Sequence, residues 1–191
     1  FSHTDVLILT FVCGLKTVSI YSMYATIYGM VDNVINIISN SVQAALGQIF
    51  HTDRKKFLKL QEAFETYYLA IVFSLLTIAF IFALPFMKLY TRGADINYVD
   101  YRLPILFTMY QLLSYGRTSS NNNLSFAGAF KETQWRAVLE ATINLVVSFI
   151  CVFKFGIYGV LFGTVVALIY RANDIICLLY TSPSPRDISG S

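Results

Sequence analysis

Charged residues are scarce in this sequence of 191 residues, since Asp, Glu, Lys and Arg together make up 13% of it. Cysteine (3), proline (4) and histidine (2) are also few. No Ser-His-Asp arrangement, zinc-ligand spacing or phosphate-binding loop appears. The net charge of +3 is too small for a nucleic-acid footprint. The composition therefore argues against an enzyme or a nucleic-acid-binding protein, and it predicts no catalytic residues, metal or cofactor.

Apolar residues dominate instead, because 56% of the sequence is hydrophobic and its mean hydropathy is +0.60. Several apolar runs approach the length of about 20 residues that crosses a hydrocarbon core of about 30 Å. The sequence therefore predicts an all-α membrane protein with about six transmembrane helices. We expect the first helix to be truncated, because the opening apolar run, residues 6–13, is too short to cross a membrane and stops at Gly14.

Residues 17–48 carry polar and aromatic side chains every three or four positions, which places them on one face of a long helix. Such a stripe indicates either a water-filled pathway or helix packing through hydrogen-bonded amides. Asp32 favours the pathway, because an ionisable residue in a spanning segment needs a partner or water. The stripe consists of Tyr24, Tyr28, Asp32, Asn36, Asn40, Gln43 and Gly47.

The orientation follows from the basic segment at residues 51–59, because short Lys- and Arg-rich loops stay on the cytoplasmic side. The loop over residues 88–102 is then external. Residues 101–130 return inward, residues 137–153 cross outward, and Gly156 lies in a tight external turn. Residues 159–179 form the last spanning helix, in which Gly159 and Gly163 have the small-xxx-small spacing that lets two helices approach closely.

Residues 101–130 are mostly apolar but carry Arg117 and three consecutive asparagines, residues 121–123. An arginine at the centre of a bilayer costs roughly 2.5 to 3.5 kcal/mol, so it normally faces a protein interior or a water-filled cavity. A guanidinium suits bidentate contact with phosphate or carboxylate. The alternative is a structural ion pair of Arg117 with Asp32 or Glu140. Asn121 and Asn122 can bond to sugar hydroxyls or to the arginine itself.

Two further helices show polar stripes, and three converging stripes predict a shared lumen. In the second of them Arg136 and Glu140 are one turn apart and can instead pair with each other. The stripes are Tyr110, Ser114, Arg117, Asn121, Ser125 and Gly128, and then Arg136, Glu140, Asn144 and Ser148.

The composition changes after residue 176, so we predict one helix bundle over residues 1–176 and a disordered tail over residues 177–191. Residues 177–187 resemble one reading frame of a transposon-end adaptor used in DNA-sequencing libraries. That likeness implies that the tail is foreign to the protein. A genuine Ser- and Pro-rich cytoplasmic linker is the alternative.

Short runs spread over residues 3–176 carry a resemblance to a known family. In order and spacing they resemble the polysaccharide flippases, which export oligosaccharides and share a superfamily with multidrug/toxin extruders and the lipid II flippase. The runs are Asp5-Val-Leu-Ile-Leu, Tyr21-Ser-Met-Tyr24, Leu46-Gly47, Pro85-Phe86, Leu89-Tyr-Thr91, Asp95, Tyr98, Gly128, Phe130-Lys-Glu-Thr133, Glu140, Asn144-Leu145, Gly156-Ile-Tyr-Gly-Val160 and Gly163-Thr164.

The resemblance implies two six-helix lobes around a central cavity in a bacterial plasma membrane. By alternating access such a protein moves an undecaprenyl-pyrophosphate-linked sugar unit between leaflets. This chain would be most of the second lobe, and a missing N-terminal lobe, membrane lipids and the lipid-linked oligosaccharide would be its partners. Arg117 fits the family's cationic residues that hold the pyrophosphate. Residues 121–126 depart from the family in being more polar.

Three other functions stay open. A cation-coupled multidrug extruder would use Asp32 and Glu140 as coupling carboxylates. A membrane-embedded sugar transferase or polymerase would normally show a long external loop, and the external loops here are short. A purely structural subunit gives no reason for charge within three helices. The predicted ligand-binding residues are Arg117, Asn121, Asn122, Asp32, Asn36, Asn40, Gln43, Glu140 and Asn144.

Overall fold

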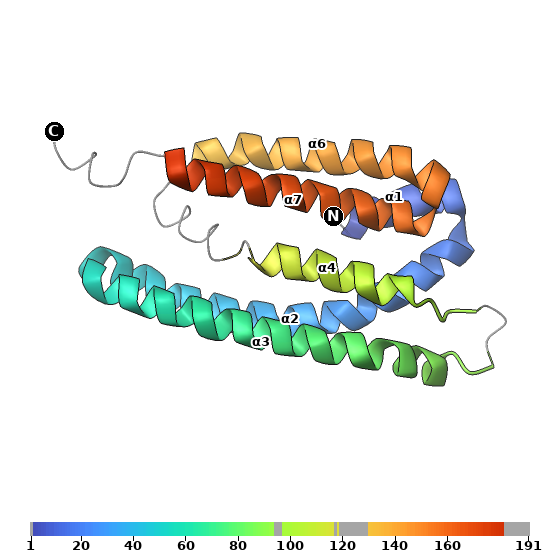
Figure 1. Cartoon of the computed structure of the whole chain (residues 1–191), viewed down its shortest axis with the longest axis horizontal. Helices are drawn as coiled ribbons and strands as arrows, with labels where there is room; N and C mark the ends of the chain where they lie inside the picture. The colour runs from blue at the N-terminus through green and yellow to red at the C-terminus, as the bar shows by residue number, and fades with distance from the viewer. Residues whose placement is uncertain (1, 94–96, 117, 119–129, 182–191) are drawn as a thin grey trace.

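The computed structural model describes residues 2–93, 97–116, 118 and 130–181, and these ranges hold helices and their connections but no strand (Figure 1). The all-α prediction is therefore confirmed for the described part of the chain. Residues 117 and 119–129 lie outside it, and with them most of the predicted polar half of the 101–130 segment. The helices are α1 (Ser2–Cys13), α2 (Leu15–Thr52), α3 (Arg54–Tyr90), α4 (Arg102–Gly116), α6 (Phe130–Phe155) and α7 (Ile157–Thr181).

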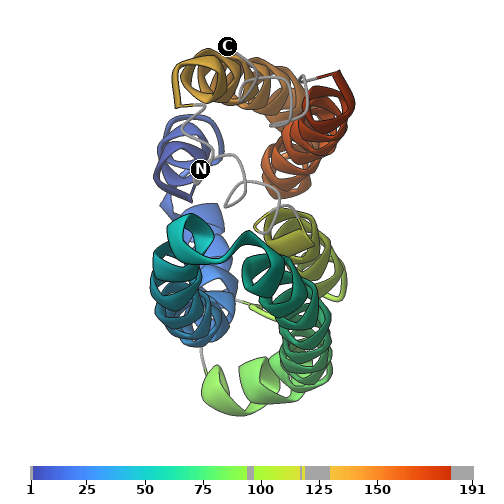
Figure 2. The same cartoon turned by 90° about the vertical axis from the view of Figure 1, so that its left-hand side faces the viewer.

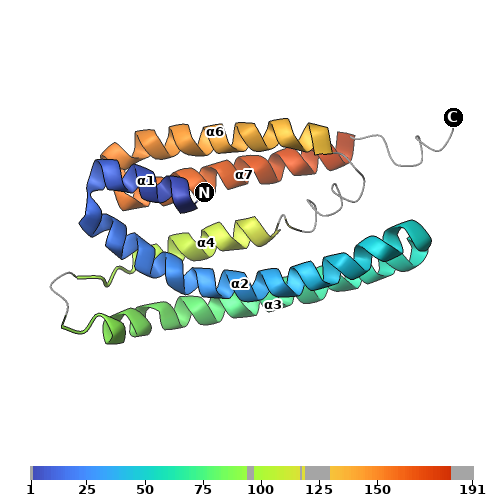
Figure 3. The ribbon, with the colours of Figure 1, turned by 180° about the vertical axis from the view of Figure 1, so that it is seen from behind.

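The helices lie side by side along the long axis of the molecule in two groups (Figures 1 and 2). One group consists of α1, α6 and α7, and the other of α2 and α3. Helix α4 lies between them and packs against both α3 and α7. Helix α2 passes from one group to the other, since it starts beside the end of α1 and then runs along α3 (Figure 3).

The junctions between helices follow the local sequence. Gly14 separates α1 from α2 with φ 80°, and Gly156 separates α6 from α7 with φ 56°. Both angles lie in the left-handed region that favours glycine. The predicted helix stop at Gly14 and the predicted tight turn at Gly156 are therefore confirmed.

Two predicted boundaries are wrong. The basic segment at residues 51–59 is not a loop, because Asp53 alone separates α2 from α3 and Lys55, Lys56 and Lys59 lie in the first turns of α3. A single residue suffices since Asp53 caps the new helix with its side chain. Helix α6 begins at Phe130 rather than at residue 137, because its first turns are polar but still helical.

The cap at Asp53 yields a prediction. Its Oδ1 accepts hydrogen bonds from the backbone N–H groups of Lys55 and Lys56, each at 3.1 Å. Replacing Asp53 by alanine removes both bonds and should destabilise the protein by about 1 kcal/mol, whereas Asp53→Asn should retain the cap. Thermal unfolding followed by circular dichroism in detergent measures the difference. Equal melting of the alanine and asparagine variants would show that the cap contributes nothing.

Helix α7 continues to Thr181, so residues 177–181 are helical although the sequence predicted a disordered tail from residue 177. Apolar residues at the start of the tail continue the helical pattern of α7. Residues 182–191 lie outside the described part, and the adaptor origin of the tail stays a prediction.

Two of the described helices have the length and composition of a membrane span. They are the 36-residue segment Lys55–Tyr90 and the 22-residue segment Gln134–Phe155. Only 22% of the most apolar part of each segment is buried, whereas the core helix of a soluble protein is mostly buried. Apolar side chains exposed in such numbers indicate contact with lipid or with more protein. Membrane association therefore has structural support at α3 and α6.

Helices α6 and α7 are in close contact where α7 carries glycine. A Cβ at Gly159 would lie 2.9 Å from the backbone N of Val152, and one at Gly163 would lie 2.7 Å from the backbone N of Ser148. Real Cβ atoms essentially never come so close to another backbone. The predicted small-xxx-small contact is therefore confirmed, and its partner is α6.

The loop before α4 is tied to α2 and α7. Tyr24 accepts a hydrogen bond from the backbone N–H of Asp100 at 3.0 Å, and its hydroxyl lies 3.1 Å from the carbonyl oxygen of Tyr98. Tyr158 of α7 donates to the Asp100 carboxylate. These bonds hold the start of α4 between α2 and α7.

Candidate functional site

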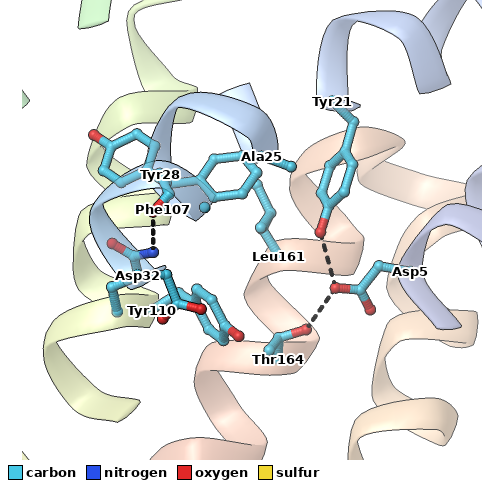
Figure 4. Close-up of a pocket in the computed structure, with 11 residues that line it drawn as sticks. Asp5, Tyr21, Ala25, Tyr28, Asp32, Phe107, Tyr110, Leu161 and Thr164 are labelled. Atoms are coloured by element: carbon cyan, nitrogen blue, oxygen red, sulfur yellow. Dashed lines mark hydrogen bonds between the residues drawn. The ribbon is translucent and has the colours of Figure 1, made fainter. Parts of the chain in front are cut away.

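A pocket of about 150 Å³ lies among α1, α2, α4 and α7 (Figure 4). Two carboxyl groups, those of Asp5 and Asp32, are on its wall, and none of its described lining residues is a Lys, Arg or His. Its lining consists of Asp5, Tyr21, Ala25, Tyr28, Gly29, Asp32, Phe107, Tyr110, Gln111, Leu161 and Thr164.

Asp5 is the most buried carboxyl group of the pocket, with a residue exposure of 2%. Its Oδ2 accepts a hydrogen bond from the Tyr21 hydroxyl at 3.1 Å and lies 3.4 Å from the Thr164 hydroxyl (Figure 4). Thr164 in turn accepts from the Asn144 side chain at 2.8 Å. Polar side chains from α1, α2, α6 and α7 thus form one connected chain. The other oxygen, Oδ1, is buried and has no hydrogen-bond partner among the described residues.

The opposite wall is formed by α2 and α4. Asp32 accepts a hydrogen bond from the Tyr115 hydroxyl. Gln111 donates from Nε2 to the backbone oxygen of Tyr28 at 2.9 Å, and Phe107 stacks on the Tyr28 ring with centroids 5.4 Å apart. This leaves the buried Oε1 of Gln111 without a hydrogen-bond partner among the described residues.

The described lining of the pocket therefore presents oxygen atoms and no cationic side chain. A buried carboxylate with an unsatisfied oxygen is expensive, and a bound proton or small cation removes most of that cost. Carboxylate, amide and hydroxyl oxygens are the donors that hard cations prefer. Within the described ranges no three His, Cys, Asp or Glu side chains gather into a metal site. The arrangement suits reversible uptake of a proton or a small monovalent cation.

The residues of the predicted stripe on α2 differ in burial along the helix. Tyr24 and Tyr28 point into the bundle, and Asp32 reaches the pocket. Asn36 and Asn40 are exposed. Gln43 is half-buried and donates to Ser39 of its own helix at 2.9 Å. Asn36 and Asn40 of the stripe therefore lie on the surface, whereas Tyr24 and Tyr28 are part of the core.

The predicted stripe on α6 faces α7. Glu140 lies 3.5 Å from the Nε of Arg171, and Asn144 donates to Thr164. Arg136 pairs with Asp174. Both charged residues of the stripe thus have partners on α7, and the stripe lies in a packed contact between two helices. Its role in ligand binding stays a prediction.

Arg117, Asn121 and Asn122 lie outside the described residues, so the predicted pyrophosphate contact stays a prediction. The sequence analysis did not select Asp5, Gln111 or Thr164 as site residues. Asp5 could have been selected, because a carboxyl group at the start of an apolar run indicates a functional site. Gln111 carried no comparable signal, because only the packing of α4 shows that its amide is buried.

No family model, curated protein or solved structure matches this chain. The resemblance to polysaccharide flippases therefore stays a prediction. Two observed features bear on the function, which are the pocket that contains Asp5 and Asp32 and the exposed surface of α2.

Proposed function

We propose that this chain is one lobe of a multi-pass transporter of the bacterial plasma membrane, with about six spanning helices. Its cargo is an undecaprenyl-pyrophosphate-linked oligosaccharide for polysaccharide biosynthesis, moved between leaflets by alternating access. A second, N-terminal lobe forms the other wall of the cavity. The observation that carries the proposal is the row of exposed amides on α2.

The exposed surface of α2 mixes amides with large apolar side chains. Val34 and Ile37 are 48% and 67% exposed, and Asn36 and Asn40 are exposed beside them. An amide that faces hydrocarbon loses its hydrogen bonds to water without replacement, which costs several kcal/mol by order of magnitude. This surface of α2 therefore suits a water-filled cavity. Amides in such a cavity can exchange hydrogen bonds with sugar hydroxyls as the cargo passes.

The oxygen-lined pocket supports a second part of the proposal, which is coupling to a cation gradient. Asp5 joins α1, α2 and α7, so its change of charge alters contacts among three helices at once. Ionisable residues within membrane helices commonly mark such ion and proton pathways. Asp32, on the opposite wall of the pocket, places a second protonatable group on α2, the helix that carries the exposed amides.

This pocket also favours the second candidate function, a cation-coupled multidrug extruder. Both functions need a coupling site, but only the flippase needs a cation for pyrophosphate. Arg117 is the residue on which the two candidates differ.

Replacing Arg117 by alanine in the full-length transporter tests the choice. Loss of a charge-assisted phosphate contact of about 1.5 to 3 kcal/mol should lower polymer export by roughly tenfold or more. Lys154→Ala, which removes a cation at an exposed position near the end of α6, is the control and should export normally. The measurement is the amount of polymer exported when each variant is expressed in a strain that lacks its own flippase. Full export by the Arg117 variant would show that Arg117 does not hold the pyrophosphate, and a wild-type transporter that restores no export would favour the extruder.

A further inference from the structure

Helices α2 and α3 diverge towards the end at which α3 stops (Figure 3). An apolar groove of about 450 Å³ lies between them there. Of the described residues that line the groove, only Thr26 and Tyr90 have polar groups in their side chains. The lining consists of Met23, Thr26, Ile27, Met30, Val31, Leu75, Ile78, Ala79, Phe82, Ala83, Phe86, Met87 and Tyr90.

The position of the groove restricts what can fill it. It follows α3, a helix with the composition of a membrane span, from Leu75 to Tyr90. At 1.5 Å per residue this is roughly 22 Å, enough to cover the hydrocarbon of one leaflet, which is roughly 15 Å thick. Tyr90 stands where interfacial aromatic residues normally anchor a spanning helix. The occupant is therefore apolar and, in the orientation that the sequence predicts, lies within the outer half of the bilayer.

The size of the groove favours a hydrocarbon chain over another helix. Ala79 and Ala83 form a small floor, and Phe82, Phe86 and Met30 are large exposed residues on its edges. A helix about 10 Å across is wider than the alanine floor and would lie over the groove rather than within it. A single extended acyl chain is much thinner than a helix.

Cationic residues at the same end of the two helices favour a negatively charged headgroup. Lys16 is exposed and lies two turns before Met23 on the same face of α2. Arg92 is exposed in the turn that follows α3. We propose that the groove holds an acyl chain of an anionic phospholipid of the outer leaflet, whose phosphate contacts Lys16 and Arg92. This proposal goes beyond the transport function, because it requires only that the chain inserts into a membrane in the orientation predicted from the sequence.

Native mass spectrometry of the 191-residue chain, released from nanodiscs of mixed phosphatidylglycerol and phosphatidylcholine, tests the proposal. The chain should retain one phosphatidylglycerol. Thr26→Phe fills the groove and should lower that retention about tenfold. Thr77→Phe is the matched control, because Thr26 and Thr77 are both exposed and each donates to the carbonyl four residues earlier. Thr77 does not line the groove, so its variant should retain the lipid.

Two more variants separate the acyl chain from the headgroup. Met30→Trp blocks the groove from its other, highly exposed edge and should repeat the effect of Thr26→Phe. Lys16→Gln should keep one bound lipid but lower the preference for phosphatidylglycerol several-fold. Equal phosphatidylglycerol retention by all four variants would overturn the proposal. So would a dimer that Thr26→Phe dissociates without changing lipid retention, because the occupant would then be a second copy.

Discussion

Replacing Gly163 by valine is expected to force α7 away from α6 and to lower stability by about 3 kcal/mol. A Cβ at this position would lie 2.7 Å from the N and 2.8 Å from the Cα of Ser148. Both are backbone atoms of α6, so no rotamer change relieves the overlap. The helices must separate, and the hydrogen bond from Ser148 to the Val160 carbonyl, 3.2 Å long, is strained as they do.

Gly29→Ala is the matched control for the Gly163 variant. Gly29 also lies in a long helix, but a Cβ there meets nothing within 4 Å. Alanine at position 29 should leave stability unchanged or raise it by up to about 1 kcal/mol, since alanine is the better helix former. Thermal unfolding in detergent compares the two. Similar melting temperatures for both variants would contradict the close contact between α6 and α7.

Replacing Arg171 by methionine is expected to destabilise the protein by about 3 to 5 kcal/mol, because it leaves buried carboxylates without their cation. The Arg171 side chain is 4% exposed and contacts Glu140 at 3.5 Å and Asp174 at 3.3 Å. Of the two carboxylates, Glu140 is the more deeply buried, with a side-chain exposure of 7%. Its negative charge would therefore lose most of its compensation.

Two comparisons test whether charge is the cause. Arg136→Gln removes a pair whose arginine is 33% exposed, and it should lower stability by no more than about 1 kcal/mol. The double variant Arg171→Met with Glu140→Leu removes both charges and should recover most of the loss. If the double variant is as unstable as Arg171→Met alone, lost packing rather than an unpaired charge explains the effect.

The positions of the helices could largely be predicted from the sequence, because apolar runs and glycine stops are local signals. Gly14 and Gly156 end helices where expected, and Gly163 makes the close contact that its spacing predicted. The junction at Asp53 could not be predicted as a single residue. Basic residues indicated a loop there, but they are also good helix formers, and only the capping side chain decides between the two.

The site was less predictable, because a helical stripe shows which residues share a face but not what that face contacts. The stripe on α6 pointed to a lumen, whereas Asn144 and Glu140 contact α7. On α2 one stripe contains both a core residue, Tyr28, and an exposed one, Asn36, because α2 passes from one helix group to the other. Such a change of environment along one helix depends on tertiary packing.

Transport by the purified full-length protein in proteoliposomes tests the central claim most directly. Undecaprenyl-pyrophosphate-linked oligosaccharide is placed in one leaflet, and its appearance in the other is followed with a membrane-impermeant glycosidase under an imposed cation gradient. The account predicts translocation that depends on the gradient and is lost in Asp5→Asn, while Asp53→Asn transports normally. Gradient-driven movement of a cationic drug with no translocation of the lipid-linked sugar would contradict the account.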